Sequence, residues 1–206
     1  YCSGKVLGMN GSHGMKLTVP GGYYLAAKPT YYTWYSGSGL VDDTVRRLTI
    51  EGDGSGNTFI DYTGPNGTTF LTVNGGDPAN AVFDPHLRFT MKGVRLQRAE
   101  SAGRKQAWGL YIKNVSICRL EEVDCHWFYH GIVFHDVIQA HLSHCQMGAN
   151  TFGMVAGRLK WTNCNVFTLD HVMFGGNSEG ALQITNGANW LLLNCAFEGN
   201  GNDDSP

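Results

Sequence analysis

The sequence lacks the signals that identify a membrane-spanning, nucleic-acid-binding or helical protein. No apolar run approaches the roughly 18 residues that a transmembrane helix needs. The 206 residues carry a formal net charge of −2, and neither Lys nor Arg forms a dense cluster along the chain, which argues against a nucleic-acid or membrane-surface partner. No long stretch shows the apolar period of an amphipathic helix.

Charged residues are also sparse, at 16% of the chain, whereas Gly is abundant with 28 residues and aromatic residues make up 12%. Glycines and aromatic residues suit short strands joined by tight turns, so the composition favours an all-β domain. No His-Glu-x-x-His or comparable metal signature occurs, and we expect no metal site and no cofactor. The segment Gly52–Gly56 lacks the Lys-Ser/Thr of a phosphate loop and is interpreted as a turn.

A repeat in the second half of the sequence is the main indication of the fold. Its anchor is an apolar residue that recurs at intervals of 22 to 29 residues, and further apolar positions lie two residues before, three after and five after each anchor. The anchors are Met91, Leu120, Leu142, Leu169 and Leu192. The other columns are Phe89, Cys118, Ala140, Phe167 and Trp190; Val94, Val123, Cys145, Val172 and Cys195; and Leu96, Cys125, Met147, Phe174 and Phe197. Alternation with a period of two predicts strands with one buried face.

One extra residue interrupts the alternation after each anchor, which predicts a corner between two strands. The second corner position holds Glu122, His144, His171 and Asn194. Eleven residues after three of the anchors a third short strand begins with a glycine, at Gly131, Gly153 and Gly180. Six residues before the anchors, a ladder of stacked polar side chains is predicted at Asn114, Asp136, Asn163 and Asn186.

Three short strands cannot bury an apolar face alone, but copies stacked about 4.8 Å apart bury a continuous core. We therefore predict a right-handed, single-stranded parallel β-helix, a solenoid with coils of about 22 residues, in one domain spanning 1–206. Residues 85–198 are predicted to form regular coils and residues 1–84 irregular first coils, with Pro29–Gly39 as a protruding loop. Because no capping segment is recognisable, we expect the chain to be a fragment of a longer protein.

These features resemble the pectate-lyase-like superfamily of right-handed parallel β-helices, which includes polysaccharide lyases, glycosidases and phage tailspikes. In the first half, the segment Lys16–Leu25 is similar to the opening coil of many members, and Leu48–Gly54 resembles their next coil. The resemblance covers about residues 16–200 and concerns the fold. It implies a polysaccharide partner and a virion or extracellular location. For a tailspike it implies a homotrimer, and for a lyase it implies Ca²⁺.

Four of the six cysteines are predicted to be unpaired. Cys145 and Cys195 share a core column but lie two coils apart, about 9.6 Å at the usual strand spacing. A disulfide needs Cα atoms within about 7 Å. Cys118 and Cys125 fall on one coil but on different strands. We interpret them as small buried hydrophobic residues.

The repeat also indicates which polar residues share one flank of the solenoid. They lie at the corner or on the strand after it: Arg95, Glu122, Asp124, His126, His144, Asp170 and His171. Since sugar-cleaving β-helices use two carboxylates, or a base with a cation, Asp124 and Glu122 are the candidate catalytic pair. Arg95, His126, His144, Asp170 and His171 are the candidate substrate-binding residues. The alternative is that a solenoid corner is polar whatever its function.

Three functions fit this pattern. The first is a carbohydrate-binding or polysaccharide-degrading β-helix, part of a phage tailspike or depolymerase. The second is a structural or adhesin β-helix without catalysis, and the third is a secreted bacterial polysaccharide lyase or glycosidase. An aromatic cluster near the start is predicted either to cap the core or to contact a glycan. It consists of Tyr23, Tyr24, Tyr31, Tyr32, Trp34 and Tyr35.

Overall fold

The computed structural model describes residues 14–33, 46–76, 87–99, 102, 105–157 and 164–201, and all its named elements are β-strands. They are β1 (Met15–Val19), β2 (Gly22–Ala26), β3 (Thr30–Thr33), β4 (Arg46–Gly52), β5 (Thr58–Tyr62), β6 (Thr69–Asn74), β7 (Leu87–Arg98), β8 (Trp108–His126), β9 (His130–Ser143), β10 (Gln146–Gly148), β11 (Phe152–Ala156), β12 (Cys164–Asp170), β13 (Met173–Gly175), β14 (Gly180–Ile184), β15 (Trp190–Leu193) and β16 (Ala196–Glu198). No helix in the described ranges is long and apolar enough to cross a membrane.

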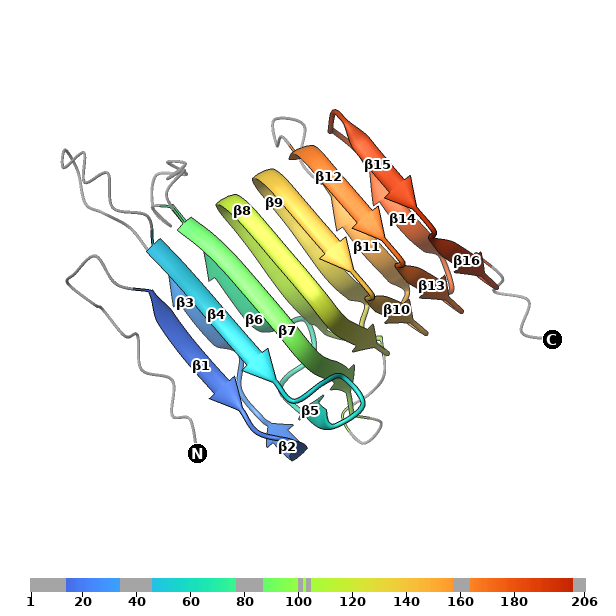
Figure 1. The fold of residues 1–206 in the computed structure, drawn as a ribbon. Helices are drawn as coiled ribbons and strands as arrows, with labels where there is room; N and C mark the ends of the chain where they lie inside the picture. Colours follow the sequence, from blue (N-terminus) through green and yellow to red (C-terminus); the bar gives the residue numbers. More distant parts are fainter. Residues whose placement is uncertain are drawn as a thin grey trace.

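All strand pairs are parallel, and successive turns of the chain stack into three sheet faces (Figure 1). The first sheet contains β1, β4, β7, β8, β9, β12 and β15. The second contains β2, β5, the ends of β7 and β8, β10, β13 and β16. The third contains β3, β6, the starts of β8 and β9, β11 and β14. This architecture confirms the predicted parallel β-helix.

The strand register reproduces the sequence repeat. The anchors pair in succession from Met91 through Leu120, Leu142 and Leu169 to Leu192. The column five residues later pairs in the same way from Leu96 to Phe197. Leu142 and Leu169 are fully buried, as predicted. The apolar columns are therefore the core of the solenoid up to Leu169 and Phe174, whereas in the last coil Leu192 and Phe197 are 40% and 49% exposed, contrary to the prediction.

The first two coils, where the sequence predicted irregular geometry, also contain three strands each and pair in register with the later coils. Leu17 and Ile50 extend the anchor column toward the N-terminus. The predicted loop over Pro29–Gly39 was wrong for residues 30–33, which form β3 because they pair with β6. The rest of that segment, including Trp34 and Tyr35, lies outside the described residues.

Two of the predicted columns are only partly correct. Gly131 stacks between Gly109 and Gly153 in the third sheet, but Gly180 pairs with Phe152, one residue out of register. In the polar ladder, Asn114 and Asp136 do adopt left-handed conformations, and the Asn114 amide donates to Asn74 Oδ1 at 3.0 Å. Asn186 does not adopt this conformation, and Asn163 lies outside the described residues.

A complete amide ladder lies at a different turn, which the sequence did not predict. It consists of Asn150, Asn177 and Asn200, one on each of three successive coils. The Asn177 carboxamide accepts from the Asn150 backbone N–H at 3.1 Å and donates to the Met147 carbonyl at 2.9 Å and to Asn200 Oδ1 at 2.7 Å. These bonds satisfy buried backbone groups where the chain leaves the second sheet.

The described cysteines, Cys118, Cys125, Cys145, Cys164 and Cys195, are all free thiols, which confirms the prediction for four of them. Burial raises the pKa of Cys145 to about 12 and shifts the pKa of Cys118 upward as well. A thiol whose pKa lies so high is protonated at neutral pH and unreactive. Cys118 and Cys145 therefore act as core residues.

Candidate functional site

The predicted corner between the first and second sheets is present, and its geometry is strained. The corner column is Gly93, Glu122, His144, His171 and Asn194, with φ angles of 63°, 52°, 53°, 53° and 50°. Gly and Asn tolerate this left-handed conformation, whereas other residues occupy it at a cost of about 1–2 kcal/mol. The middle three coils nevertheless hold Glu or His. We call Glu122, His144 and His171 the corner row.

The corner row projects into solvent, since all three residues are exposed. The imidazole rings of His144 and His171 stack with their centroids 5.0 Å apart and their planes inclined by 7°. His171 Nδ1 lies 2.7 Å from Asp170 Oδ1, which fixes the orientation of that ring. The structure thus brings together three of the predicted binding residues. Glu122 makes no hydrogen bond or ion pair with the described residues.

Asp124 and Arg95 form an ion pair on the outer face of the second sheet. Arg95 donates from Nη2 at 3.0 Å and from Nε at 3.3 Å, both to Asp124 Oδ2. Asp124 is only 5% exposed. The guanidinium of Arg95 also lies 5.3 Å from the centre of the Phe59 ring. The ion pair engages the Asp124 carboxylate, whereas the Glu122 carboxylate lies at the corner without such a partner among the described residues. A catalytic role for Asp124 and Glu122 stays a prediction.

His126 lies two positions beyond Asp124 and is half-buried. Burial lowers its pKa, and the nearby Asp124 carboxylate opposes part of that shift. Its Nε2 has no hydrogen-bond partner among the described residues. The ring covers Gly148, where an added Cβ would lie 2.7 Å from two ring atoms. His126 is therefore set back from the corner row and packs against the second sheet.

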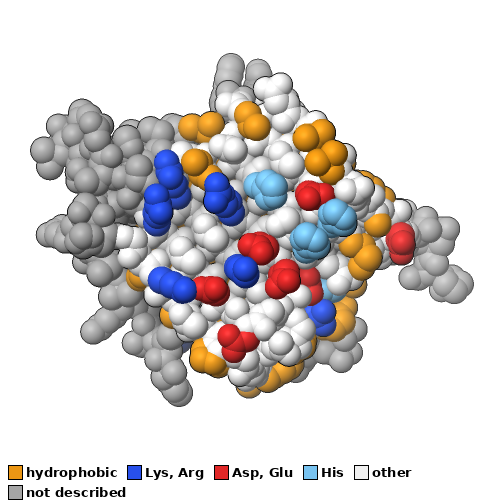
Figure 2. Space-filling model, in the orientation of Figure 1, with side chains coloured by type: hydrophobic (Ala, Val, Ile, Leu, Met, Phe, Trp, Pro, Cys, Tyr) orange, Lys and Arg blue, Asp and Glu red, His pale blue; other side chains and the backbone are white. Residues whose placement is uncertain are grey.

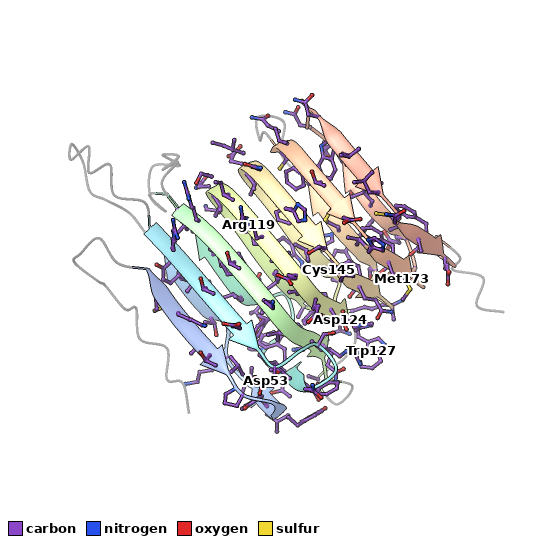
Figure 3. All side chains as sticks on the ribbon, in the orientation of Figure 1. Asp53, Arg119, Asp124, Trp127, Cys145 and Met173 are labelled. Carbon is purple, nitrogen blue, oxygen red and sulfur yellow. The ribbon has the colours of Figure 1, made fainter. Side chains whose placement is uncertain are left out.

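A shallow hollow with a volume of about 350 Å³ lies on the first-sheet side of the corner, across β8 and β9. It is lined by Ile117, Cys118, Arg119, Leu120, Glu121, Gln139, His141 and Ser143. Figure 2 shows this face, with basic, acidic and histidine side chains spread across it, and Figure 3 labels Arg119 before the corner and Asp124 after it. The hollow adjoins the corner row because Glu121 and Ser143 directly precede Glu122 and His144.

Sequence reasoning missed Arg119, Gln139 and His141 as members of the site. The sequence could have indicated them, because they occupy the outward positions of the same strands whose inward positions carry the anchors.

The predicted aromatic cluster separates into buried and exposed residues. Tyr24 and Tyr32 pack against the core, whereas Tyr23 and Tyr31 are 62% and 61% exposed. Within the described residues, no group of His, Cys, Asp and Glu is arranged to hold a metal ion.

Comparison with known proteins shows the fold class. No family model and no curated protein matches the sequence. Among solved structures, ORF18 of Geobacillus virus E2 aligns over 93% of this chain with a TM-score of 0.59 and 14% identity. The chain spans 36% of that protein. The A-module of the mannuronan C-5 epimerase AlgE4 from Azotobacter vinelandii aligns over 88% of this chain and 68% of its own length, with a TM-score of 0.32 and 12% identity. At this identity, the first likeness shows a common β-helix architecture.

Proposed function

We propose that this chain is a polysaccharide-binding part of a β-helix, with glycan contacts along the corner row and in the adjoining hollow. The observation that carries the proposal is the backbone strain at Glu122, His144 and His171. A left-handed corner would be more stable with Gly or Asn, as at both ends of the column. Strained conformations at exposed polar residues are typical of binding sites, where the side chain is needed.

The spacing of the site suits a repetitive polymer. Parallel stacking places equivalent side chains of neighbouring coils about 4.8 Å apart, so the same hydrogen-bonding groups recur along the solenoid axis. The hollow adds both donors and acceptors, with Arg119, Gln139 and Ser143 among its lining residues. A polysaccharide that lies across these coils can form similar contacts from one coil to the next.

We further infer that the protein is located in a virion or outside the cell. Support comes from the coarse likeness to a virus protein, together with a polar, repetitive outer surface. Oligomerisation as a homotrimer belongs to the same proposal. A non-catalytic adhesin is the second candidate, and it is favoured by the Arg95–Asp124 pair, which engages one of the two predicted catalytic acids.

The proposal is tested by incubating the protein with a panel of bacterial surface polysaccharides. Binding is measured by co-sedimentation, and cleavage by reducing ends and by the absorbance of unsaturated uronic products. We expect Glu122→Gln to weaken binding, whereas Glu179→Gln, which removes an exposed carboxylate away from the corner, leaves binding unchanged. Asp124→Asn combined with Glu122→Gln abolishes cleavage if the pair is catalytic. Failure of the wild-type protein to bind any polysaccharide contradicts the proposal.

A further inference from the structure

A diagonal row of basic side chains crosses the outer face of the first sheet. Arg47 and Arg88 pair in register on β4 and β7. Arg119 follows on β8, where it pairs with Thr90 of β7, and its partner on β9 is His141. The row thus spans four successive coils, about 14 Å along the axis at the usual spacing. It ends in the hollow, which both Arg119 and His141 line.

Two carboxylates on the face that carries this row are paired with lysines. On the same face, Glu51 pairs with Lys16, and Glu121 pairs with Lys92 at 3.2 Å. Asp170 contacts His171 at 2.7 Å. By contrast, none of Arg47, Arg88 and Arg119 makes an ion pair or a side-chain hydrogen bond within the described ranges. Among the described residues, this face therefore carries positive charge that no described carboxylate pairs with, although the whole chain is slightly acidic.

The guanidinium groups of Arg47, Arg88 and Arg119 suit a ligand with anionic groups. A guanidinium presents donors in a planar fork that matches a carboxylate, sulfate or phosphate group. Lys16 and Lys92 pair with carboxylates, whereas no carboxylate in the described ranges pairs with these three arginines. The row is also central in the solenoid, with described coils on either side, so its exposure is not a consequence of an open end.

We propose that the row Arg47, Arg88, Arg119 and His141 binds the acidic groups of a charged polysaccharide by direct guanidinium contacts, without a bridging divalent cation. This inference rests on the proposed glycan binding and narrows the ligand to acidic glycans. The corner row then contacts hydroxyl groups of the same polymer, while the arginines contact its charged groups. The acidic group is a carboxylate of a uronic acid, or a sulfate or phosphate substituent.

The test compares one acidic polysaccharide with its carboxyl-reduced form, which has the same backbone and no charge. Sulfated and phosphate-bearing polymers form separate arms, and duplex DNA serves as a polyanion that is not a polysaccharide. We expect the acidic form to bind at least about 10-fold more tightly than the reduced form. The affinity of the acidic form should decrease as the salt concentration rises. Addition of EDTA leaves this affinity unchanged.

Three variants identify the row. Each of Arg47→Gln, Arg88→Gln and Arg119→Gln is expected to weaken binding of the acidic polymer by about 2- to 5-fold, the range for exposed charge contacts, and the triple variant by about 10-fold or more. Lys28→Gln and Lys113→Gln remove the same charge away from the row and are expected to change binding less than 2-fold. Urea denaturation of every variant shows that folding is retained.

The outcomes separate this inference from the proposed function. Equal binding of the acidic and reduced polymers, sensitive to Glu122→Gln, overturns the arginine row and leaves glycan binding intact. Loss of acidic binding in EDTA overturns the direct contact. DNA bound as tightly as the acidic polysaccharide also overturns the inference, because the row would then be unselective. No binding of any polysaccharide overturns both.

Discussion

Replacing Glu122 by Gly is expected to stabilise the protein and to weaken glycan binding. Glu122 has a φ of 52°, is exposed and makes no hydrogen bond or ion pair with the described residues, so its side chain contributes little to the folded state. A left-handed conformation costs an L-residue about 1–2 kcal/mol, and glycine removes this cost. Glycine also has greater backbone entropy in the unfolded chain, which offsets about 0.5–1 kcal/mol of the gain. The expected net gain in the free energy of unfolding is therefore about 0.5–1 kcal/mol.

Glu122→Ala is the matched control, because it removes the carboxylate and keeps the left-handed strain. Urea denaturation followed by circular dichroism measures the free energy of unfolding of the wild-type protein and both variants, and co-sedimentation measures polysaccharide binding. The two variants should lose binding equally and differ in stability. If Glu122→Gly is no more stable than Glu122→Ala, the corner is not strained, and backbone strain gives no support to a binding role for Glu122.

Three further outcomes are expected from the fold. Leu142→Ala leaves a cavity in the anchor column and should cost about 2–5 kcal/mol in the free energy of unfolding, measured by urea denaturation. Asn177→Ala leaves the Asn150 N–H and the Met147 carbonyl without partners and should cost about 2–4 kcal/mol, with faster hydrogen exchange of the Asn150 amide. The hydrogen bond to Asp61 raises the pKa of Tyr23 above its ordinary value of 10.0. This hydrogen bond therefore stabilises the folded state fully below pH 10.0, and the stabilisation is lost as the pH rises through the raised pKa. Ultraviolet difference titration should show this raised pKa, and Asp61→Asn should lower it.

The sequence predicted the fold well because a parallel solenoid places equivalent residues of successive coils directly above one another. Any apolar column in the sequence must then be a stack in space, as Leu120, Leu142 and Leu169 show. The extra residue after each anchor likewise predicted the corner, but not its left-handed backbone conformation. Gly180 was misplaced because the spacing from an anchor to the third strand depends on the length of the intervening turn, which differs between coils.

The site was less predictable, for two different reasons. The Arg95–Asp124 ion pair could have been inferred, since the repeat placed opposite charges at adjacent positions of one outward column, a single strand spacing apart. The hollow beside Arg119 could not, because its depth depends on the heights of side chains from neighbouring coils. The amide ladder was missed because an apolar residue, Phe128, takes its position in the preceding coil and interrupts the pattern.

Positions of the corner column share one backbone conformation but differ in the space that is available for a side chain. At Gly93 the neighbouring backbone excludes a side chain, because an added Cβ would lie 2.7 Å from the Gly54 backbone nitrogen and 2.9 Å from the Gly52 carbonyl oxygen. At Glu122 and His144 the same backbone conformation meets open solvent, and a side chain is accommodated at the expense of strain alone. Gly93→Ala should therefore destabilise the protein without affecting the polar face. Glu122→Gly acts in the opposite sense on stability, because that corner is sterically free and the substitution removes its strain. Under the proposed function, the same substitution also removes a side chain that contacts the glycan.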